Sequence, residues 1–177
     1  GNIVSQRCEE NTENLQEWID EKPERDRQKL IADELTFIGQ KLERFKTLPD
    51  TTISVKDLID SCKPKLNKIK VALGSSDEFY LNISSTVIRA AQNMLVQTVN
   101  NVIEASDKSY GIISVNGKVI IENVLDLTYK MGTFDMNIEL KLNYKKNLEG
   151  IKNIARQLRI STSSPKEKIQ VEKALDD

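Results

Sequence analysis

The side chains that could do chemistry in this chain of 177 residues are carboxylates and amines, because the sequence contains no histidine. Without imidazole, the chain lacks Ser–His and Cys–His nucleophile pairs, the commonest general base near neutral pH, and histidine metal ligands. Glu10, Glu13 and Glu17 would share one face if their segment is helical, and such carboxylates can bind a hard cation or act as acid and base. Because an acidic run near a terminus is typical of a solvated face, we predict no catalytic residue, no metal site and no cofactor.

The glycines and cysteines of the chain form no recognisable site. Neither of the two glycine-rich phosphate-binding patterns occurs, and there is no Cys-x-x-Cys pair. Cys8 and Cys62 provide no disulfide framework and no zinc set. We therefore expect both cysteines to be free and Cys62 to lie in a core.

Basic side chains form a candidate binding site for an anion. They gather between residues 63 and 70, on the outer side of a predicted helix, and again in the last third of the chain. The candidates are Lys63, Lys65, Lys68, Lys70, Lys145 and Arg156. These residues would either bind an anionic ligand or nucleic acid, or pack against the acidic N-terminal helices. Nucleic-acid binding would favour interleaved aromatics or arginines, and Tyr144 is the only aromatic residue after Phe134, so we favour internal packing.

The least charged stretch of the chain runs from Phe79 to Ile103. Arg89 is its only charge, although charged residues make up 30% of the chain. We therefore expect the rest of the chain to cover this stretch. A lone arginine in a covered helix requires a carboxylate from another helix or a route to solvent. Its functional interpretation is an anion-binding group at the floor of a groove.

Amide side chains follow Arg89 along the same stretch. Asn93 and Gln97 are the candidate binding residues among them, and Asn100 and Asn101 continue the series. These amides form either the solvent-facing stripe of a helix or its contact with a partner helix, where uncharged polar groups would set the register.

The elements that would position these residues have helical periodicity. Two heptad seams recur at alternating spacings of four and three, as in packed helices. The first seam is Ile31, Leu35, Ile38, Leu42 and Phe45, and the second is Val55, Ile59, Cys62, Leu66, Ile69 and Leu73. Pro64 interrupts the second seam without changing its phase, which predicts one kinked helix or two short ones. Ser54 is the predicted cap of this helix, and the small residue Gly39 would let another helix approach the first.

The connection between the second seam and the uncharged stretch is short. Gly74 predicts the end of one helix and Ser76 the start of the next, so the two should form an antiparallel hairpin. The second of them, at about 79–103, is apolar on most of its circumference and should lie among several neighbours.

Two segments give conflicting patterns. Over 112–121, β-branched residues flank Asn116-Gly117, a strong hairpin signal, yet apolar residues from Ile120 onward recur at helical spacing. We predict a turn at Asn116-Gly117 followed by a helix over 118–131, with the hairpin as the alternative. Over 134–144, apolar residues alternate as in a strand, but Met, Glu, Lys and Leu dominate, so we predict a helix there as well.

The predicted fold is all-α, a multi-helix bundle around a central helix at about 79–103. The alternative is a mainly α fold with a small β-hairpin at 112–121. We expect one domain over 1–160, whose first residues (about ten) are loosely ordered, and then a loop and a short helix over 161–177. The run Ser164-Pro165-Lys166-Glu167 combines a cap, a proline and a capping box at the start of that helix.

The function that these patterns favour is a non-catalytic helical module for protein interaction or structure, which binds a protein partner or self-associates. A binder of an anionic ligand or nucleic acid is the alternative, and an enzyme that works without histidine is the least favoured hypothesis. The net charge is −1, and no apolar run reaches about 18 residues, so we expect no membrane insertion and a cytoplasmic location. The chain begins with Gly1, and we expect it to be a fragment of a larger protein.

Overall fold

The computed structural model describes residues 25–109 and 111–175, and in these ranges the chain is helix and loop without any strand. The predicted all-α class is confirmed, and the alternative with a β-hairpin at 112–121 is wrong. The acidic run at Glu10–Glu17, the loose order of the first residues and the state of Cys8 lie outside the described residues.

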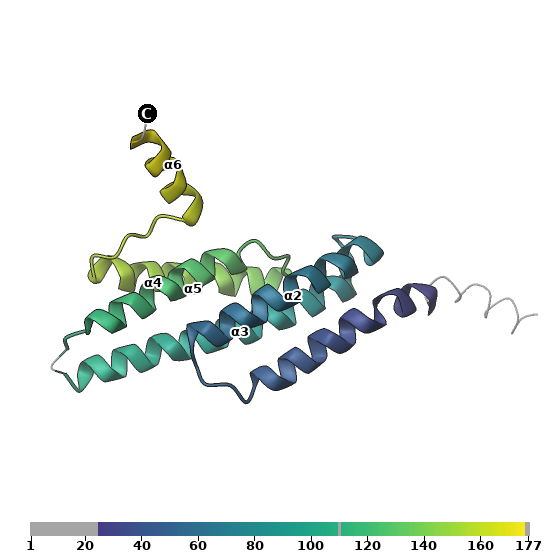
Figure 1. The fold of residues 1–177 in the computed structure, drawn as a ribbon, viewed down its shortest axis with the longest axis horizontal. Helices are drawn as coiled ribbons and strands as arrows, with labels where there is room; N and C mark the ends of the chain where they lie inside the picture. Colours follow the sequence, from purple (N-terminus) through teal and green to yellow (C-terminus); the bar gives the residue numbers. More distant parts are fainter. Residues whose placement is uncertain (1–24, 110, 176–177) are drawn as a thin grey trace, which may run out of the picture.

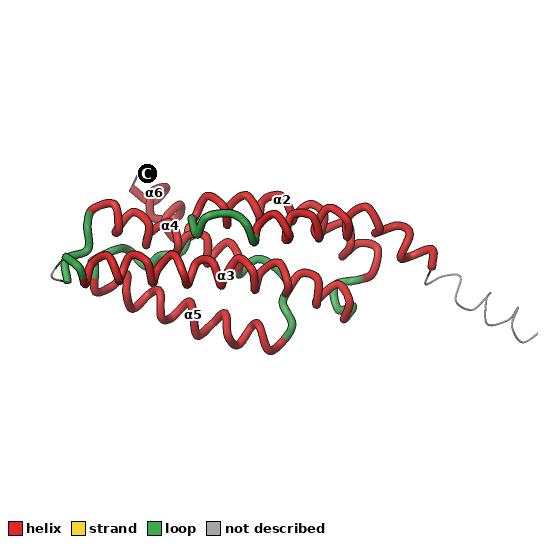
Figure 2. The backbone as a smooth tube through the Cα atoms, turned by 90° about the horizontal axis from the view of Figure 1, so that it is seen from below, coloured by secondary structure: helices red, strands yellow, loops and turns green. Residues whose placement is uncertain are grey.

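Among the described residues, five helices pack side by side, and a further short one leads away from them (Figure 1). The first described helix covers residues 25–45. The next are α2 (Thr52–Leu73), α3 (Glu78–Asp107), α4 (Val115–Met131), α5 (Ile138–Gln157) and α6 (Pro165–Leu175). Helix α3 contacts α2, α4 and α5, while α4 contacts α2 and α5. Figure 2 shows α3 running between α2 and α5.

Helix α2 is one continuous helix, and its buried side carries the predicted seam from Val55 to Ile69. Pro64 lies inside it at an exposed position, so the prediction of one helix that continues across Pro64 is confirmed and that of two short ones is wrong. The predicted cap is wrong: Thr51 caps the helix, because its hydroxyl accepts the hydrogen bond of the Ser54 amide at 3.2 Å. Cys62 is free and fully buried, as expected.

Helix α3 begins two residues later than Ser76 because Asp77 is its N-cap, with a carboxylate that accepts from the Tyr80 amide at 2.9 Å. The prediction that this helix is apolar on most of its circumference and lies among several neighbours agrees with its contacts and its burial. Its buried apolar residues include Tyr80, Val87, Ile88, Ala91, Met94, Leu95, Val99 and Val102.

Helix α4 corrects the prediction for Asn116-Gly117, which lies in the first turn of the helix and not in a turn before it. Ser114 is the cap, because its hydroxyl accepts from the Gly117 amide at 3.0 Å. The buried residues from Ile121 to Met131 follow helical spacing. A cap three residues before Gly117 therefore overrides the local hairpin signal.

Helix α5 only partly matches the helix predicted over 134–144. Residues 134–137 form a loop, and Asn137 caps the helix by accepting from the Leu140 amide at 3.0 Å. The alternating apolar residues do not share one buried face, because Leu140 is buried whereas Ile138 is 80% exposed and Leu142 is exposed as well. Helix α6 begins with the predicted capping box: the Ser164 amide donates to Glu167 at 2.6 Å, and the Glu167 amide donates back to the Ser164 hydroxyl.

Gly39 does not permit the close helix approach that we predicted, since no atom of another described helix lies within 4 Å of the position its Cβ would take. We expect Gly39→Ala to raise the free energy of unfolding by about 1 kcal/mol through helix propensity alone. Gly74→Ala is the matched comparison, because Gly74 ends α2 at φ 104° and ψ 154°, a conformation that costs other residues about 1–3 kcal/mol. Urea denaturation should show opposite signs for the two variants, and equal signs would contradict this backbone assignment.

Candidate functional site

The solvent face of α3 is the candidate functional site. Between Asn82 and Glu104, the exposed positions lie along one side of the helix, and we call them the α3 stripe. Its members are Asn82, Thr86, Arg89, Asn93, Val96, Gln97, Asn100, Asn101 and Glu104. The sequence candidates Arg89, Asn93 and Gln97 therefore lie together on one surface. Helices α2, α4 and α5 contact other sides of α3, and this stripe is open to solvent.

Arg89 is not at the floor of a groove, so the premise that it lies in a covered part of the helix is wrong. Its side chain is 50% exposed, and one guanidinium nitrogen lies 3.9 Å from the Glu139 carboxylate of α5. Both groups are well solvated, and an ion pair of this kind contributes about 0–1 kcal/mol. Of the interpretations considered, the structure matches an exposed side chain that pairs with an acid of another helix.

The exposed residues of the stripe are mostly uncharged amides, in contrast to the other exposed helix face beside it, that of α5. Asn93, Gln97, Asn100 and Asn101 are all exposed, and the Gln97 amide donates to Asn101 at 3.1 Å. The solvent face of α5 has the opposite character. Its exposed charges are Glu139, Lys141, Lys145, Lys146, Glu149 and Arg156. The α3 stripe is thus a low-charge surface next to a highly charged one.

One amide of α3 is inside the protein and was not singled out from the sequence. Gln92 is only 4% exposed, and neither its amide nitrogen nor its amide oxygen has a hydrogen-bond partner among the described residues. Gln92 lies two helical turns after Ser85, whose hydroxyl accepts from the Asn137 amide at the start of α5. This spacing places Gln92 on the side of α3 that faces α5. The sequence could not show this, because it does not reveal which helix packs against that side of α3.

Two of the candidate lysines of α2 contact the first described helix. Lys68 pairs with Glu34 at 3.3 Å, and the ammonium of Lys65 lies 5.1 Å from the centre of the Phe37 ring. The carboxylate of Glu34 accepts a hydrogen bond from the backbone N–H of the same residue, and the Lys68 ammonium lies nearby. Both interactions hold the pKa of Glu34 below its usual range. The interpretation that acidic N-terminal and basic later segments pack together agrees with these contacts.

The other two candidate lysines of α2 hold the loop at 132–137. Lys70 pairs with Asp135 at 2.9 Å, and Lys63 donates to the Thr133 hydroxyl at 3.1 Å. From α3, the Tyr80 hydroxyl donates to the Asp135 carboxylate at 2.7 Å and the Ser84 hydroxyl to its carbonyl at 2.6 Å. Sequence reasoning missed this anchor because its partners lie far apart along the chain.

Lys145 and Arg156 are in different surroundings. Lys145 and Lys141 line a pocket of about 410 Å³ beside the same loop, together with Leu81 and Tyr144. Arg156 donates to Asn153 at 2.7 Å, about 16 Å further along α5. The structure therefore gathers Lys63, Lys70 and Lys145 around one loop and leaves Arg156 apart.

No protein-family model, curated protein or solved structure matches this chain. Its own geometry is therefore the basis for a functional proposal. Across residues 25–109 and 111–175, no group of three or more His, Cys, Asp or Glu side chains is placed to hold a metal ion. Within those ranges, none of the helices combines the length and the apolar character that crossing a membrane requires.

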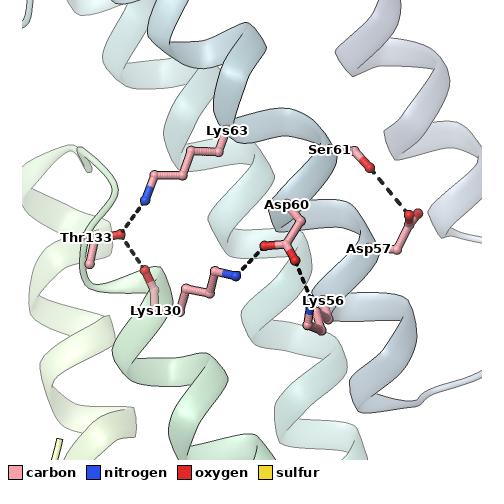
Figure 3. A network of polar contacts seen from close by, with 7 residues as sticks. All are labelled: Lys56, Asp57, Asp60, Ser61, Lys63, Lys130 and Thr133. Atoms are coloured by element: carbon pink, nitrogen blue, oxygen red, sulfur yellow. Dashed lines mark hydrogen bonds and ion pairs between the residues drawn. The ribbon is translucent and has the colours of Figure 1, made fainter. Parts of the chain in front are cut away.

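A carboxylate between two lysines links α2 and α4 (Figure 3). Asp60 accepts from Lys56 at 2.6 Å on its own helix and pairs with Lys130 of α4. Hydrogen bonds from Lys130 and Lys56 hold the pKa of Asp60 below its usual range. Asp135 has a lowered pKa for the same reason, with Lys70 as the main cause and Tyr80 as the second.

These two carboxylates predict a loss of stability in acid. A lowered folded-state pKa means that the stabilisation is fully present above the unfolded-state pKa of about 4 and is lost as the pH falls below it. We expect the free energy of unfolding to fall on going from neutral pH to below about pH 4, and the fall to be shallower in Asp60→Asn. Urea denaturation across the pH range measures both, and an identical pH dependence in the variant would contradict the contribution of Asp60.

Proposed function

We propose that this chain is a non-catalytic protein-interaction module, a helical bundle organised around α3, in which the α3 stripe binds a protein partner. The observation that carries the proposal is the low charge of that exposed face. From Asn82 to Asn101 its only charged side chain is Arg89, in a chain with 30% charged residues. Protein interfaces are depleted of charged residues at their centre, whereas a face used only for solvation has no such requirement.

The composition of the stripe supports a specific polar interface and not a predominantly hydrophobic one. Val96, which is 39% exposed, lies in the middle among amides that can donate and accept hydrogen bonds. The charged residues of α5, such as Glu139, would form a solvated rim on one side. Along the helix axis, the stripe is about 33 Å long, which is sufficient for a partner helix of several turns.

The test introduces charge at the centre of the stripe without touching the core. Asn93→Lys/Gln97→Lys adds two positive charges there, and Asn143→Lys/Gln157→Lys adds the same charge to exposed positions of α5. Each tagged protein is incubated with cell lysate, and retained proteins are quantified by mass spectrometry. Light scattering reports self-association in parallel. We expect a binding partner that the wild type and the α5 variant retain and that the α3 variant loses at least about tenfold. Equal retention by all three, or a strictly monomeric wild type without any partner, would rule the proposal out.

A second candidate function, the binding of an anionic ligand, is favoured by one observation. The pocket beside 132–137 is lined by Lys141 and Lys145, and Lys63 and Lys70 reach the same loop from α2. Binding through these lysines would weaken steeply as salt is added. Lys141→Glu/Lys145→Glu should then abolish retention on immobilised heparin. A wild type that does not bind heparin, RNA or DNA at low salt would eliminate this candidate.

A further inference from the structure

We infer that the partner bound by the α3 stripe is a second copy of this chain, with the two α3 helices antiparallel. This inference rests on the proposed function of the stripe. It is carried by the two charges that the stripe contains, Arg89 and Glu104, which are opposite in sign and about 22 Å apart along the helix. The other members of the stripe are uncharged.

The positions of these two charges make the stripe complementary to itself. A twofold axis midway between Val96 and Gln97 brings Arg89 opposite Glu104 of the partner subunit, and by symmetry Glu104 opposite the partner subunit's Arg89. In the same register, Asn93 faces Asn100 of the partner subunit, so amides meet amides. A parallel pair in register would instead set each charge against its own kind, which is repulsive. Self-complementarity of this kind is what an isologous dimer requires and what a different partner does not.

The spacing of the stripe also fits a helix pair. Its members recur at intervals of four and three, the heptad spacing of packed helices. Asn82, Thr86, Arg89, Asn93, Val96 and Asn100 follow this spacing, and Glu104 lies one residue beyond the next position of the series. Polar residues at such positions fix the register and orientation of helix pairs at a cost in affinity, so the dimer is reversible and not obligate.

The present contact of Arg89 does not oppose this arrangement. Its guanidinium lies 3.9 Å from Glu139, at the limit of an ion pair, and the Glu139 side chain is 84% exposed. Turning toward Glu104 of the partner subunit therefore costs the chain little, since exposed pairs contribute about 0–1 kcal/mol.

The test is a charge swap measured by sedimentation velocity over a dilution series. In Arg89→Glu, both intersubunit pairs become Glu opposite Glu, and in Glu104→Arg both become Arg opposite Arg. We expect each variant alone to dimerise about tenfold more weakly than the wild type. In an equimolar mixture, each heterodimer regains two opposite-charge pairs, so the wild-type affinity should return. Glu43→Gln is the control, because it removes an exposed ion pair with Lys46 on the first described helix, away from the stripe, and should leave dimerisation unchanged.

A second measurement does not depend on these charges. In a Cys8→Ser background, Val96→Cys places a thiol next to the proposed axis, and under mild oxidation it should form a disulfide-linked dimer. Asn82→Cys is on the same stripe but about 43 Å from its counterpart, so it should not. Cys62 is buried and stays in both proteins.

Three results would overturn the inference. They are a wild type that stays monomeric at high concentration, a dimer that neither charge variant weakens, and single variants whose mixture does not recover. The first also distinguishes this inference from the proposed function. If a partner from lysate is still lost by Asn93→Lys/Gln97→Lys, the stripe binds a different protein and only the second copy is excluded.

Discussion

Leu95→Ala is expected to lower the free energy of unfolding by about 3 kcal/mol, the largest effect among the substitutions considered. Leu95 is fully buried in the middle of α3, on the side opposite to the stripe. Removing its branched end loses the favourable burial of those apolar atoms. It also leaves a cavity that the neighbouring helices fill only in part. The adjacent Val96 is 39% exposed and belongs to the stripe, so Val96→Ala should change the free energy by no more than about 0.5 kcal/mol.

Urea denaturation compares the free energies of unfolding of the two variants. Because Leu95 and Val96 are neighbours in sequence but lie on different sides of α3, the comparison tests which side of the helix is buried. The expected difference is several-fold larger than the error of the method. Equal destabilisation by Leu95→Ala and Val96→Ala would mean that α3 is rotated relative to the arrangement described above. In that case the stripe would not be a surface, and the function proposed for it would fail with it.

Gln92→Met is expected to raise the free energy of unfolding by about 1–2 kcal/mol. The amide of Gln92 is buried without a hydrogen-bond partner among the described residues, and such a group loses its hydration without replacement. Methionine has a similar length and no strongly polar atom, so it fills the same space without that penalty.

Gln97→Met is the matched comparison for Gln92→Met. It makes the same chemical change at an exposed position of the same helix, where the effect should stay within about 0.5 kcal/mol. A destabilised Gln92→Met protein would contradict the orphaned state of the amide and would mean that a bound water or another group satisfies it.

Local patterns predicted the helices whose buried side is continuous. In α2, the seam from Val55 to Ile69 keeps its phase across Pro64, because the proline lies on the exposed side where the missing hydrogen bond faces water. In α3, the sequence predicted a helix that is apolar on most of its circumference, and its buried apolar residues run from Tyr80 to Val102. Periodicity was sufficient here because each helix has enough turns for one side to dominate.

Helix starts and the loop at 132–137 were not predictable to the same degree. Thr51, Asp77 and Ser114 compete with other residues that cap equally well in isolation, and packing of the neighbouring helix decides among them. The loop depends on Tyr80, Ser84 and Lys70, which reach Asp135 from two other helices. No local pattern contains information of that range.

The candidate site was half predictable. The low charge near Arg89 singled out the helix that carries the candidate site, but a covered core and a partner-facing surface give the same signal, because both exclude charge. Only the burial of individual positions separates them, with Gln92 inside and Asn93 outside. Two neighbouring amide residues thus differ in burial, and the average composition of a stretch cannot show which of them is buried.

The most direct test of the central claim, that the α3 stripe is the binding surface, is an NMR titration of its side-chain amides. Spectra of the free protein are compared with spectra of the bound one, where the bound state is reached by raising the protein concentration or by adding a partner retained from lysate. We expect the largest shift changes at Asn93, Gln97 and Asn100, and none at Asn143 or Asn153 on α5. Binding that leaves the three stripe amides unchanged would contradict the account.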